Sequence, residues 1–492
     1  MSKTGPREAA AAFPVRVDRH ALAGGVRETH LSILVFVADR VYKLRKPVCF
    51  DFLDLTSREN RETDCHREVQ LNRRLAPDVY LGVADIVMSG ELIDHMVVMR
   101  AMPESKQLAS LVDSGSDVNA ELESIARVLA SFHARARRST EISACATADA
   151  LRSKWRANFD EMDPFVSAFV DPMVEGQIRC LVGQWLDRHV DLLGSRITGG
   201  FICDGHGDLQ ASDIFCLESG VRILDCLQFS DTLRYDDICG DVAFLAMDLE
   251  RLGHADAART FVHAYERDSG NPLPQSLLHF HIALRAYVRA KVACLRAVQG
   301  SETAVDAARQ HHLLARRHLL HARRTVVLVG GLPGSGKTTL ARAIGAELGW
   351  IVLSSDAARR DLAPGAERYS RQTMEAVYAD LFRQARDQLR RGASVVLDAS
   401  WINADERAQA AQVGTQMQAE LVELQCICAD DLATQRIRHR LEQRDDDSEA
   451  TVSVRALMAT RMDPWPTATA LDTTCSTAES VERAIAVVAA AR

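Results

Sequence analysis

The residues with the clearest chemistry form the stretch GLPGSGKT at 331–338. Its glycines let the backbone turn tightly, so that successive amide N–H groups can point at phosphate oxygens. The lysine can bridge the outer phosphates of a nucleotide, and the threonine hydroxyl can bind magnesium. The motif requires a strand before it and a helix after it, and RTVVLVG and GKTTLARAIGAELG predict both. The candidate nucleotide-binding residues are Gly331, Gly334, Ser335, Gly336, Lys337, Thr338 and Thr339.

Two acids follow later strands of the same region. Asp356, in SSDAARR, ends the second predicted strand, where parallel sheets place residues beside a phosphate site. It can accept the proton of a hydroxyl group, and Arg359 can hold an anionic part of the acceptor or the transferred phosphoryl group. The alternative is a helix N-cap Asp with a surface Arg. Asp398 ends the third strand, where it would meet the metal or its water shell or simply terminate the strand.

A stripe of arginines lies further along, in RIRHRLEQR. Arg436, Arg440 and Arg444 recur every four residues, so they share one face of a predicted helix. The stripe can close over bound phosphates as a lid, or it can be a solvated helix face. The charge pattern leaves both open.

A second set of residues is centred on HGDLQASDIF at 206–215. Asp208 is placed to act as a base, and Asp213 stands five residues on, where a magnesium ligand is expected. Asp225 ends a short strand one hairpin later and supplies a second acid. Upstream, Lys43 on a predicted strand and Glu68 on a predicted helix form a candidate ATP-anchoring pair.

Different elements must position the two sets. LSILVFV and VYKLRK predict a hairpin, residues 56–75 a helix capped by Thr56 or Ser57, and residues 95–103 a buried strand. Mostly helical sequence then surrounds a short β region at 201–230. After residue 323 strands alternate with helices, one of them capped by Ser370, which predicts a parallel sheet covered by helices.

Length and composition limit the function classes. A chain of 492 residues predicts two or three domains, and 47% hydrophobic with 26% charged residues is typical of a globular protein. The net charge of −8 gives no electrostatic case for a long nucleic-acid partner, although it leaves room for a local basic groove. The twelve cysteines form no CxxC pair, which favours reduced thiols. No segment reaches the ~20 apolar residues of a membrane span, and the N-terminal apolar run is too short for a signal peptide, so we expect a cytoplasmic protein.

These residues resemble two known families. Residues 325–470 resemble the P-loop kinases that include gluconate kinase, the zeta-toxin type and polynucleotide 5′-kinases, through the D-x-x-R spacing after the second strand. Residues 25–300 resemble the aminoglycoside phosphotransferase superfamily, through HGDL, the later acids, YKLRKPVCFDFLD and LRYDDICGDVAFLAMDLE, and in particular its subset fused to a C-terminal P-loop kinase. The resemblance implies ATP, magnesium (Mg2+) and phosphorylation of a hydroxyl group.

The chain departs from the second family at several positions. THLS (29–32) takes the place of a G-x-G-x-x-G loop, and Asp213 stands where an Asn is usual. An acidic cluster could bind a cationic amino sugar, although we favour acids that complement a helix dipole. The cluster comprises Asp231, Asp236, Asp237 and Asp241.

The sequence therefore predicts an N-terminal arm (1–24), an α+β bilobal protein-kinase-like domain (25–322) and an α/β P-loop NTPase domain with a parallel sheet (323–492). The expected function is a bifunctional ATP-dependent phosphotransferase that acts on hydroxyls of sugars, amino sugars or related metabolites. One alternative is a polynucleotide 5′-hydroxyl kinase in the second domain, against which the acidic chain and the lack of clustered aromatics weigh. Another is a first domain that senses nucleotide without turnover.

The candidate catalytic residues are Asp208, Asp356, Lys337, Arg359, Arg436 and Arg440. The candidate metal ligands are Asp213, Asp225, Thr338 and Asp398. The acceptors and the oligomeric state stay open.

Overall fold

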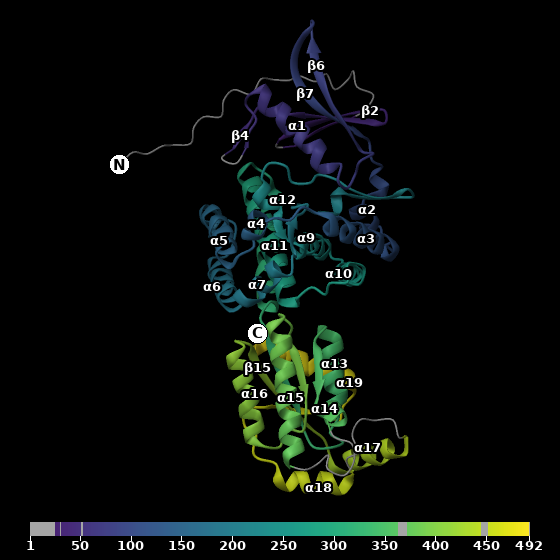
Figure 1. Ribbon diagram of the computed structural model, residues 1–492, viewed down its shortest axis with the longest axis vertical. Coiled ribbons are helices and arrows are strands. Elements are labelled where there is room, and N and C mark those ends of the chain that lie inside the picture. Colours follow the sequence, from purple (N-terminus) through teal and green to yellow (C-terminus); the bar gives the residue numbers. More distant parts are fainter. Residues whose placement is uncertain (1–24, 30, 51–52, 363–370, 444–450, 492) are drawn as a thin grey trace, which may run out of the picture. The chain divides into compact units, whose positions relative to one another are not determined.

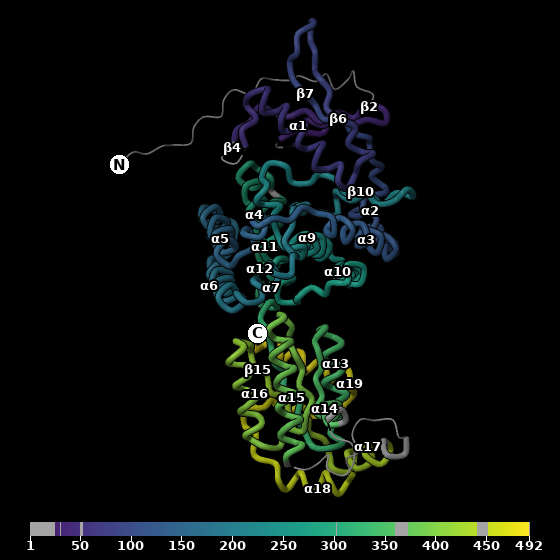
Figure 2. Tube along the Cα trace, viewed as in Figure 1, coloured from purple at the N-terminus to yellow at the C-terminus, as the bar shows by residue number. Residues whose placement is uncertain are grey.

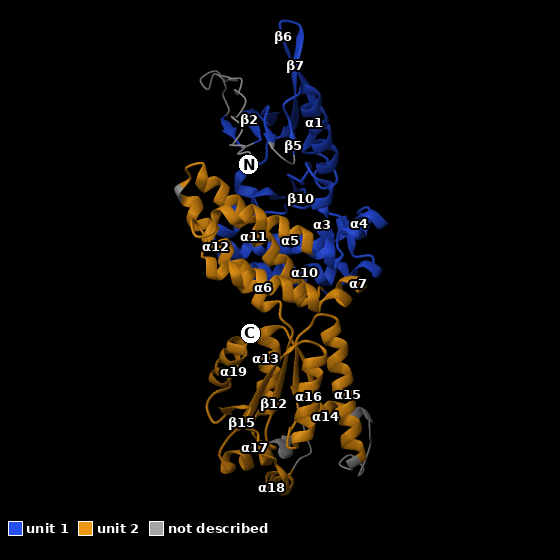
Figure 3. Ribbon diagram, turned by 90° about the vertical axis from the view of Figure 1, so that its left-hand side faces the viewer, with its two compact units in different colours: residues 1–151, 196–272 blue, residues 152–195, 273–492 orange. Residues whose placement is uncertain are grey.

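The computed structural model describes residues 25–29, 31–50, 53–362, 371–443 and 451–491. The expected N-terminal arm and the expected helix cap at Ser370 lie outside these residues. The chain divides into two compact units, shown in blue and orange in Figure 3. Unit 1 comprises residues 1–151 and 196–272, and unit 2 comprises residues 152–195 and 273–492.

Unit 1 begins with a five-stranded antiparallel sheet (Figure 1). The predicted hairpin is formed by its second and third strands, which pair Leu34 with Lys43. The predicted strand at 95–103 ends at Arg100, three residues before Pro103. In sheet order the strands are β1 (Val26–Glu28), β2 (Ser32–Val37), β3 (Arg40–Arg45), β7 (Glu91–Arg100) and β6 (Tyr80–Met88).

Helix α1 (Arg58–Asn72) packs on this sheet. The Ser57 hydroxyl caps it by accepting a hydrogen bond from Asn60 N, so the second of the two predicted caps is the one used. Its Cys65 and Val69 join the buried side chains of the sheet, and Glu68 on the same helix is fully buried. Packing of α1 on the sheet thus fixes the position of Glu68 relative to β3.

The rest of unit 1 is mostly helical, with short β pairs that carry the HGD loop. Strand β8 ends just before the loop, and the β9–β10 hairpin follows it. The further elements are β4 (Cys49–Phe50), β5 (Leu53–Asp54), α2 (Leu108–Asp113), α3 (Asn119–Arg135), α4 (Thr140–Ala144), β8 (Ile202–Asp204), β9 (Ile214–Leu217), β10 (Gly220–Ile223), α8 (Asp231–Arg234), β11 (Tyr235–Asp237), α9 (Ile238–Arg251) and α10 (Ala255–Ser269). Short 3-10 turns occupy Glu104–Lys106, Asp163–Phe165 and Ala211–Asp213, the second of them in unit 2.

Unit 2 combines a group of helices with the P-loop sheet. The sequence placed the domain boundary at 322, whereas the compact units divide so that residues 152–195 and 273–322 group with the sheet. Hydrogen bonds join the two parts: Ser276 N donates to Gly392 O at 3.2 Å, and Arg324 Nη2 donates to Arg188 O at 2.9 Å. These helices are α5 (Ala148–Met162) and α7 (Val190–Thr198), which straddle the division, together with α6 (Pro172–Arg188), α11 (Gln275–Val298) and α12 (Glu302–His321).

The sheet of unit 2 is five-stranded and parallel throughout, as predicted. The strand that leads into the P-loop is central in it. In sheet order the strands are β13 (Ile351–Ser354), β14 (Val395–Asp398), β12 (Thr325–Gly330), β15 (Glu420–Ile427) and β16 (Thr469–Asp472). The helices are α13 (Lys337–Leu348), α14 (Ser355–Leu362), α15 (Arg371–Arg390), α16 (Ala404–Gln416), α17 (Asp430–Gln443), α18 (Val452–Arg461) and α19 (Thr477–Ala491).

Helices cover both faces of this sheet. On β12, Val326 and Leu328 pack toward α15 and α16, while Val327 and Val329 pack toward α13 and α19, which lie side by side in Figure 2. A strand buried on both faces reads as a continuous apolar run, which is what TVVLV provides. The carboxyl ends of the strands therefore meet at one edge, where the P-loop begins. No helix within the described ranges is long and apolar enough to cross a membrane.

Candidate active sites

The P-loop in unit 2 has the backbone that its glycines predict. Gly331, Gly334 and Gly336 have φ of 142°, 78° and 84°, a region that other residues rarely adopt. A Cβ atom would lie 2.6 Å from Cys426 O at Gly331 and 2.6 Å from Ala433 O at Gly334. The loop therefore needs glycine for its conformation and for its close approach to β15 and α17.

Helix α13 starts directly after this loop and opens onto a cavity of about 490 Å³. Lys337, Thr338 and Thr339 line the cavity with their helix N-terminus, whose unpaired amides and dipole favour anions. The rest of the lining comes from α17, from the segment between β16 and α19, and from the start of α19. Its residues include Arg436, His439, Thr473, Cys475, Thr477 and Ser480.

Asp398 lies at the back of the P-loop, at the end of β14, with 2% of its surface exposed. Burial raises the pKa of its carboxyl, against the Lys337 charge and a hydrogen bond with Thr338, which lower it. Its Oδ1 is buried and has no hydrogen-bond partner among the described residues. A carboxylate oxygen without a partner beside a threonine hydroxyl fits a magnesium ion, which prefers oxygen donors.

Asp356 and Arg359 lie on one side of α14, as their spacing predicts. Arg359 Nη1 is 2.8 Å from Asp356 Oδ1, and the two side chains are only 13% and 15% exposed. Asp356 is inside the first turn of the helix, and Arg359 is largely shielded from solvent, so the alternative of a cap with a surface arginine does not describe them. The charge of Asp356 is a smaller contribution to the raised pKa of Asp398, so the two carboxyls are within electrostatic range of each other.

Arg436 faces the P-loop. Its Nη2 donates to Thr473 O at 2.9 Å, and its Nη1 is buried without a hydrogen-bond partner in the described part of the chain. Nη1 would be 3.5 Å from a Cβ atom at Gly336. The side chain of Arg440 and the whole of Arg444 lie outside the described residues, so the stripe of three arginines is seen only at its first member.

Arg455 supports the P-loop, and its part in the site was missed by sequence reasoning. From α18 its Nη1 donates to Pro333 O at 2.7 Å, and its Nη2 donates to Asp430 Oδ1 at 2.7 Å. The Thr473 hydroxyl similarly donates to Ser335 O at 2.6 Å. Both contacts join residues more than 100 positions apart in the chain, so no local spacing could indicate them.

In unit 1 the predicted Lys–Glu pair is formed. Lys43 Nζ on β3 lies 2.8 Å from Glu68 Oε1 on α1 and 2.9 Å from Asp225 Oδ1. Burial lowers the Lys43 pKa, but the Asp225 and Glu68 carboxylates outweigh it, so the net shift is upward. Arg45 also contacts Glu68 and lies 2.6 Å from Asp64. Strand β3, helix α1 and the segment after β10 thus bring together residues that the sequence separates by more than 150 positions.

The acids of the HGD loop lie near this pair. Asp208 Oδ2 accepts a hydrogen bond from Gln210 Nε2 at 3.1 Å. Burial, then Asp225, then Asp208 raise the pKa of Asp213 well above its usual value, so the three carboxyls are within electrostatic range. Asp225 lies two residues beyond the end of β10, with a left-handed φ of 62°. Within the described ranges, no three or more His, Cys, Asp or Glu side chains are grouped closely enough to hold a metal ion.

Asp241 on α9 holds the HGD loop in place. Its Oδ2 accepts from His206 N at 2.7 Å and its Oδ1 from Gly207 N at 2.8 Å, while His133 Nε2 is 3.1 Å from Oδ2. Burial alone would raise the pKa of this carboxyl, but the histidines and the backbone amide hold it well below the usual value. A Cβ atom at Gly205 would lie 2.6 Å from Asp241 Oδ2, so a glycine is needed there.

Other members of the acidic cluster have different roles from Asp241. Asp237 caps α9, as the helix-dipole interpretation expects, and it also binds Arg196 through both oxygens. Asp231 contacts Arg67 and Arg234. Arginines thus neutralise these two acids, which does not favour a site for a cationic amino sugar. Sequence reasoning missed the loop-holding role of Asp241, because its spacing fitted a helix start equally well.

Residues 326–465 match the family model described as an AAA domain. Solved structures that match include a gluconokinase from Sinorhizobium meliloti (16% identical, 34% of this chain and 93% of that chain, TM-score 0.27) and an APS kinase from Mycobacterium tuberculosis in complex with AMPPNP and APS (21%, 34% and 98%, TM-score 0.28). Both TM-scores are low, and the P-loop fold rests on the strand order and loop geometry given above.

Two relatives match nearly the whole chain. They are uncharacterized proteins of Mycobacterium tuberculosis and Mycobacterium bovis, each 40% identical over 472 residues, which is 93% of this chain and 94% of theirs. The match includes both the HGD region and the P-loop region. The chain therefore belongs to the same protein family as these two mycobacterial proteins.

Proposed function

We propose that unit 2 transfers the γ-phosphoryl group of ATP to a hydroxyl group of a small molecule. The observation that carries the proposal is the buried, unpartnered Oδ1 of Asp398 behind a glycine-built P-loop, with the Asp356 carboxyl nearby. This combines a phosphate cradle, an acid suited to a metal and a second acid suited to a base. A P-loop that only binds nucleotide needs no such second acid.

Each residue of the P-loop site has a separate role in the proposed transfer. Lys337 and the amides of the P-loop bind the β- and γ-phosphates, and Arg436 closes the cavity over them. The acceptor oxygen forms a bond to the γ-phosphorus while the bond to the bridging oxygen breaks and ADP leaves. Asp356, held by Arg359, takes the proton of the hydroxyl. Thr338 and Asp398 would hold magnesium, which supplies neutralisation of phosphate charge when it is bound.

We further propose a second phosphotransferase site in unit 1, so that the chain is bifunctional. The Lys43–Glu68 pair supports it, because a lysine fixed by a glutamate can hold the phosphates of ATP. Asp208 is the base, and the carboxylates of Asp213 and Asp225 would hold magnesium. The acceptors are hydroxyl-bearing metabolites such as sugars. The twelve free cysteines support a cytoplasmic setting.

One observation favours the alternative that unit 1 senses nucleotide without turnover. Lys43 is paired with Asp225 as well as with Glu68, so the lysine and the candidate metal ligand neutralise each other. A nucleotide must separate Lys43 from Asp225 before both can act on phosphates and metal. This cost lowers affinity or turnover in unit 1 alone and leaves unit 2 unchanged.

The test is ATP consumption by the full chain with a panel of sugars, amino sugars and a 5′-hydroxyl oligonucleotide. We expect acceptor-dependent ADP release that Lys337→Ala and Asp208→Asn each reduce for different acceptors. Loss through Lys337→Ala alone, for every acceptor, would favour the sensor alternative. Activity on the oligonucleotide alone would make unit 2 a polynucleotide kinase, and no acceptor-dependent release with any compound would contradict the proposal.

A further inference from the structure

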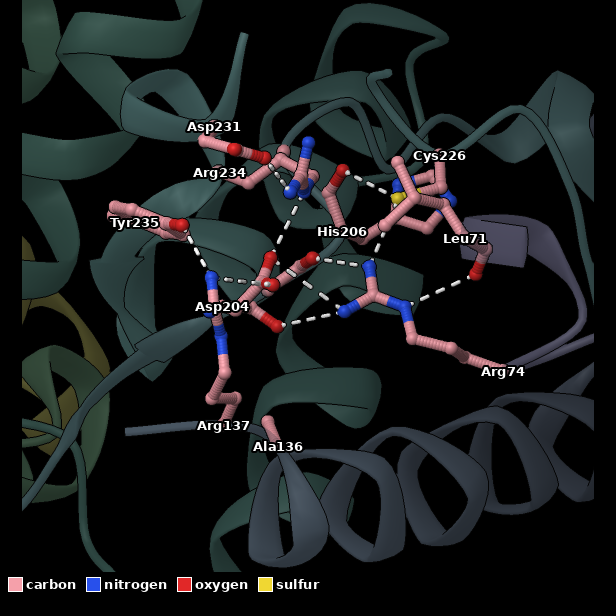
Figure 4. Close-up of polar contacts among 12 residues, drawn as sticks. Leu71, Arg74, Ala136, Arg137, Asp204, His206, Cys226, Asp231, Arg234 and Tyr235 are labelled. Atoms are coloured by element: carbon pink, nitrogen blue, oxygen red, sulfur yellow. Dashed lines mark hydrogen bonds and ion pairs between the residues drawn. The ribbon is translucent and has the colours of Figure 1, made fainter. Parts of the chain in front are cut away.

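Unit 1 contains a cavity of about 680 Å³ that the proposed reactions do not use. It lies between α1, the end of α3, β8 and α8, and Figure 4 shows the polar contacts around it. Five arginines line it: Arg67, Arg74, Arg135, Arg137 and Arg234. The acidic residues in the lining are two, Asp204 and Asp231, so the wall carries three more positive than negative charges.

Asp204 is shared by three of the arginines. Arg234 Nε donates to its Oδ1 at 2.8 Å, while Arg74 Nη1 lies 3.5 Å from Oδ1 and Arg137 Nη2 3.8 Å from Oδ2 (Figure 4). One carboxylate cannot neutralise three guanidinium groups. Arg137 is also 62% exposed, so its charge is available to a ligand in the cavity.

Asp231 is shared in the same way by Arg67 and Arg234. The Nε of Arg67 is buried, and no described residue accepts a hydrogen bond from it. Arg135 forms no ion pair with any described residue, and its Nε donates only to the Ser131 carbonyl, at 3.1 Å. The cavity thus holds guanidinium groups whose charge the protein leaves uncompensated.

We propose that this cavity binds a small anionic molecule that carries two or more phosphate groups. Guanidinium groups bind phosphate in a bidentate manner, and a cluster of them selects for several negative charges. The volume is that of a small-molecule site, which favours a metabolite over a nucleic-acid strand on an open surface. Leu71 and Phe132 add an apolar wall for a non-charged part of the ligand.

The cavity adjoins the HGD loop through Arg74. Its guanidinium donates to Asp204 O at 3.1 Å and Gly205 O at 2.9 Å, directly before the loop, and to Cys226 Sγ at 3.1 Å, directly after Asp225. A phosphate group that binds Arg74 would therefore change the contacts of the segments next to Asp208 and Asp225. Binding at the cavity is independent of the proposed function, since it requires no turnover in either unit.

The test is hydrogen–deuterium exchange of the full chain, without magnesium, over a titration with inorganic tripolyphosphate. We expect protection in peptides that cover 129–138 and 227–236, and separately in the P-loop peptide, which serves as an internal reference. Arg135→Ala should raise the half-protecting concentration for the first two peptides by about tenfold, the usual effect of losing one charged hydrogen-bonding group. The P-loop midpoint should not move.

Arg127→Ala is the matched control, because it removes another exposed arginine from the same helix α3, one that does not line this cavity. It should leave every midpoint unchanged. Arg135→Glu provides a second variant and should weaken protection more than Arg135→Ala, while exchange in ligand-free α3 reports that the helix is intact. The proposal is overturned if the two peptides stay unprotected when the P-loop is saturated, or if Arg127→Ala and Arg135→Ala shift them equally. Protection by a single-stranded oligonucleotide at lower concentration than tripolyphosphate would overturn the small-molecule assignment.

Discussion

Arg359 holds the carboxylate of Asp356 one helical turn away, with Nη1 2.8 Å from Oδ1 and both side chains largely buried. The pair fixes the direction of the carboxylate at the carboxyl end of β13. In the proposed reaction, Asp356 is a base whose position is set before the acceptor binds, which would remove part of the entropic cost of the reaction. Arg359 would act through Asp356 and would also place a positive charge near the transferred phosphoryl group.

Replacing Asp356 by Asn should reduce turnover at the P-loop site by about 10²–10⁴-fold, because the amide cannot accept the proton. The ATP dissociation constant should change little, since the base contacts the acceptor. Turnover with saturating acceptor and calorimetric ATP affinity measure the two effects. Asp387→Asn, an exposed acid on α15, is the control. A collapse of ATP affinity with unchanged turnover per bound nucleotide would make Asp356 a nucleotide or metal ligand.

Asp241→Asn should destabilise unit 1 by about 1–3 kcal/mol at neutral pH, because one amide oxygen cannot replace two carboxylate oxygens that accept backbone hydrogen bonds. The folded pKa of Asp241 is lowered, so its contribution is full above the unfolded pKa of about 3.9 and declines as pH falls below it. Urea unfolding at several pH values should show the wild-type advantage shrinking below about pH 4. Asp256→Asn, on the surface of α10, should show no such advantage at any pH, and a constant Asp241→Asn effect down to pH 3 would contradict the assignment.

Because His189 is buried, we expect the stability of unit 2 to fall at acidic pH. Burial, and then the Arg324 charge, lower its pKa to about 3, and its Nδ1 lies 2.8 Å from Trp185 O. An unfolded histidine binds a proton near pH 6.5, so the neutral folded form contributes stability above that pH and loses it as pH falls toward about 3. The slope reaches at most about 1.4 kcal/mol per pH unit.

His189→Asn should therefore lower the free energy of unfolding at pH 7 and flatten its decline between pH 6.5 and 5. The exposed His263→Asn should keep the wild-type slope. Urea unfolding at four pH values in this range is the measurement. Equal slopes for wild type and His189→Asn would show that His189 is protonated at the same pH in both states.

Substitutions at Asp213 should change how the activity of unit 1 depends on magnesium. Burial, and then repulsion from Asp225 and Asp208, raise the pKa of Asp213 well above its usual value. For scale, two unit charges ~4 Å apart repel by about 4 kcal/mol at an effective dielectric constant of 20. Asp213→Asn should keep activity with a flatter magnesium dependence, whereas Asp213→Ala should lose activity unless magnesium is raised. Initial rates of the full chain carrying Lys337→Ala isolate unit 1. Asp213→Ala rates equal to wild type at every magnesium concentration would remove this residue from the metal site.

The sequence could predict those parts of the site that lie in short patterns. The P-loop and the Asp356–Arg359 pair each depend on residue spacing within one strand–loop–helix segment. The parallel sheet was predictable from the alternation of strands and helices along the chain. The Lys43–Glu68 pair was also predictable, because a strand lysine and a helix glutamate appear in the required order. Asp225, the second partner of Lys43, was predicted only as a metal ligand, because no sequence pattern shows which carboxylate a lysine will contact.

The features that sequence reasoning did not reveal depend on tertiary contacts. Arg455 reaches Pro333 O from over 100 residues away, and Asp241 clamps the HGD loop from a helix whose start looked like a simple dipole arrangement. The compact units also divide the chain at other positions than the predicted boundary. Apolar periodicity shows that the helices of 273–322 are buried, but it does not show that Ser276 bonds to Gly392 in the P-loop unit.

The most direct test of the account is transfer of the labelled γ-phosphate of ATP to acceptor by the full chain and by its Lys337→Ala variant. Lys337 lies at the N-terminus of α13 in the cavity with Arg436 and Asp398 nearby, so its loss would remove the positive charge that we propose faces the transferred phosphoryl group. We predict that Lys337→Ala abolishes transfer to the acceptor of unit 2, while calorimetry still detects one ATP site, in unit 1. Undiminished transfer to every acceptor by Lys337→Ala would contradict the claim that the P-loop site is a phosphotransferase.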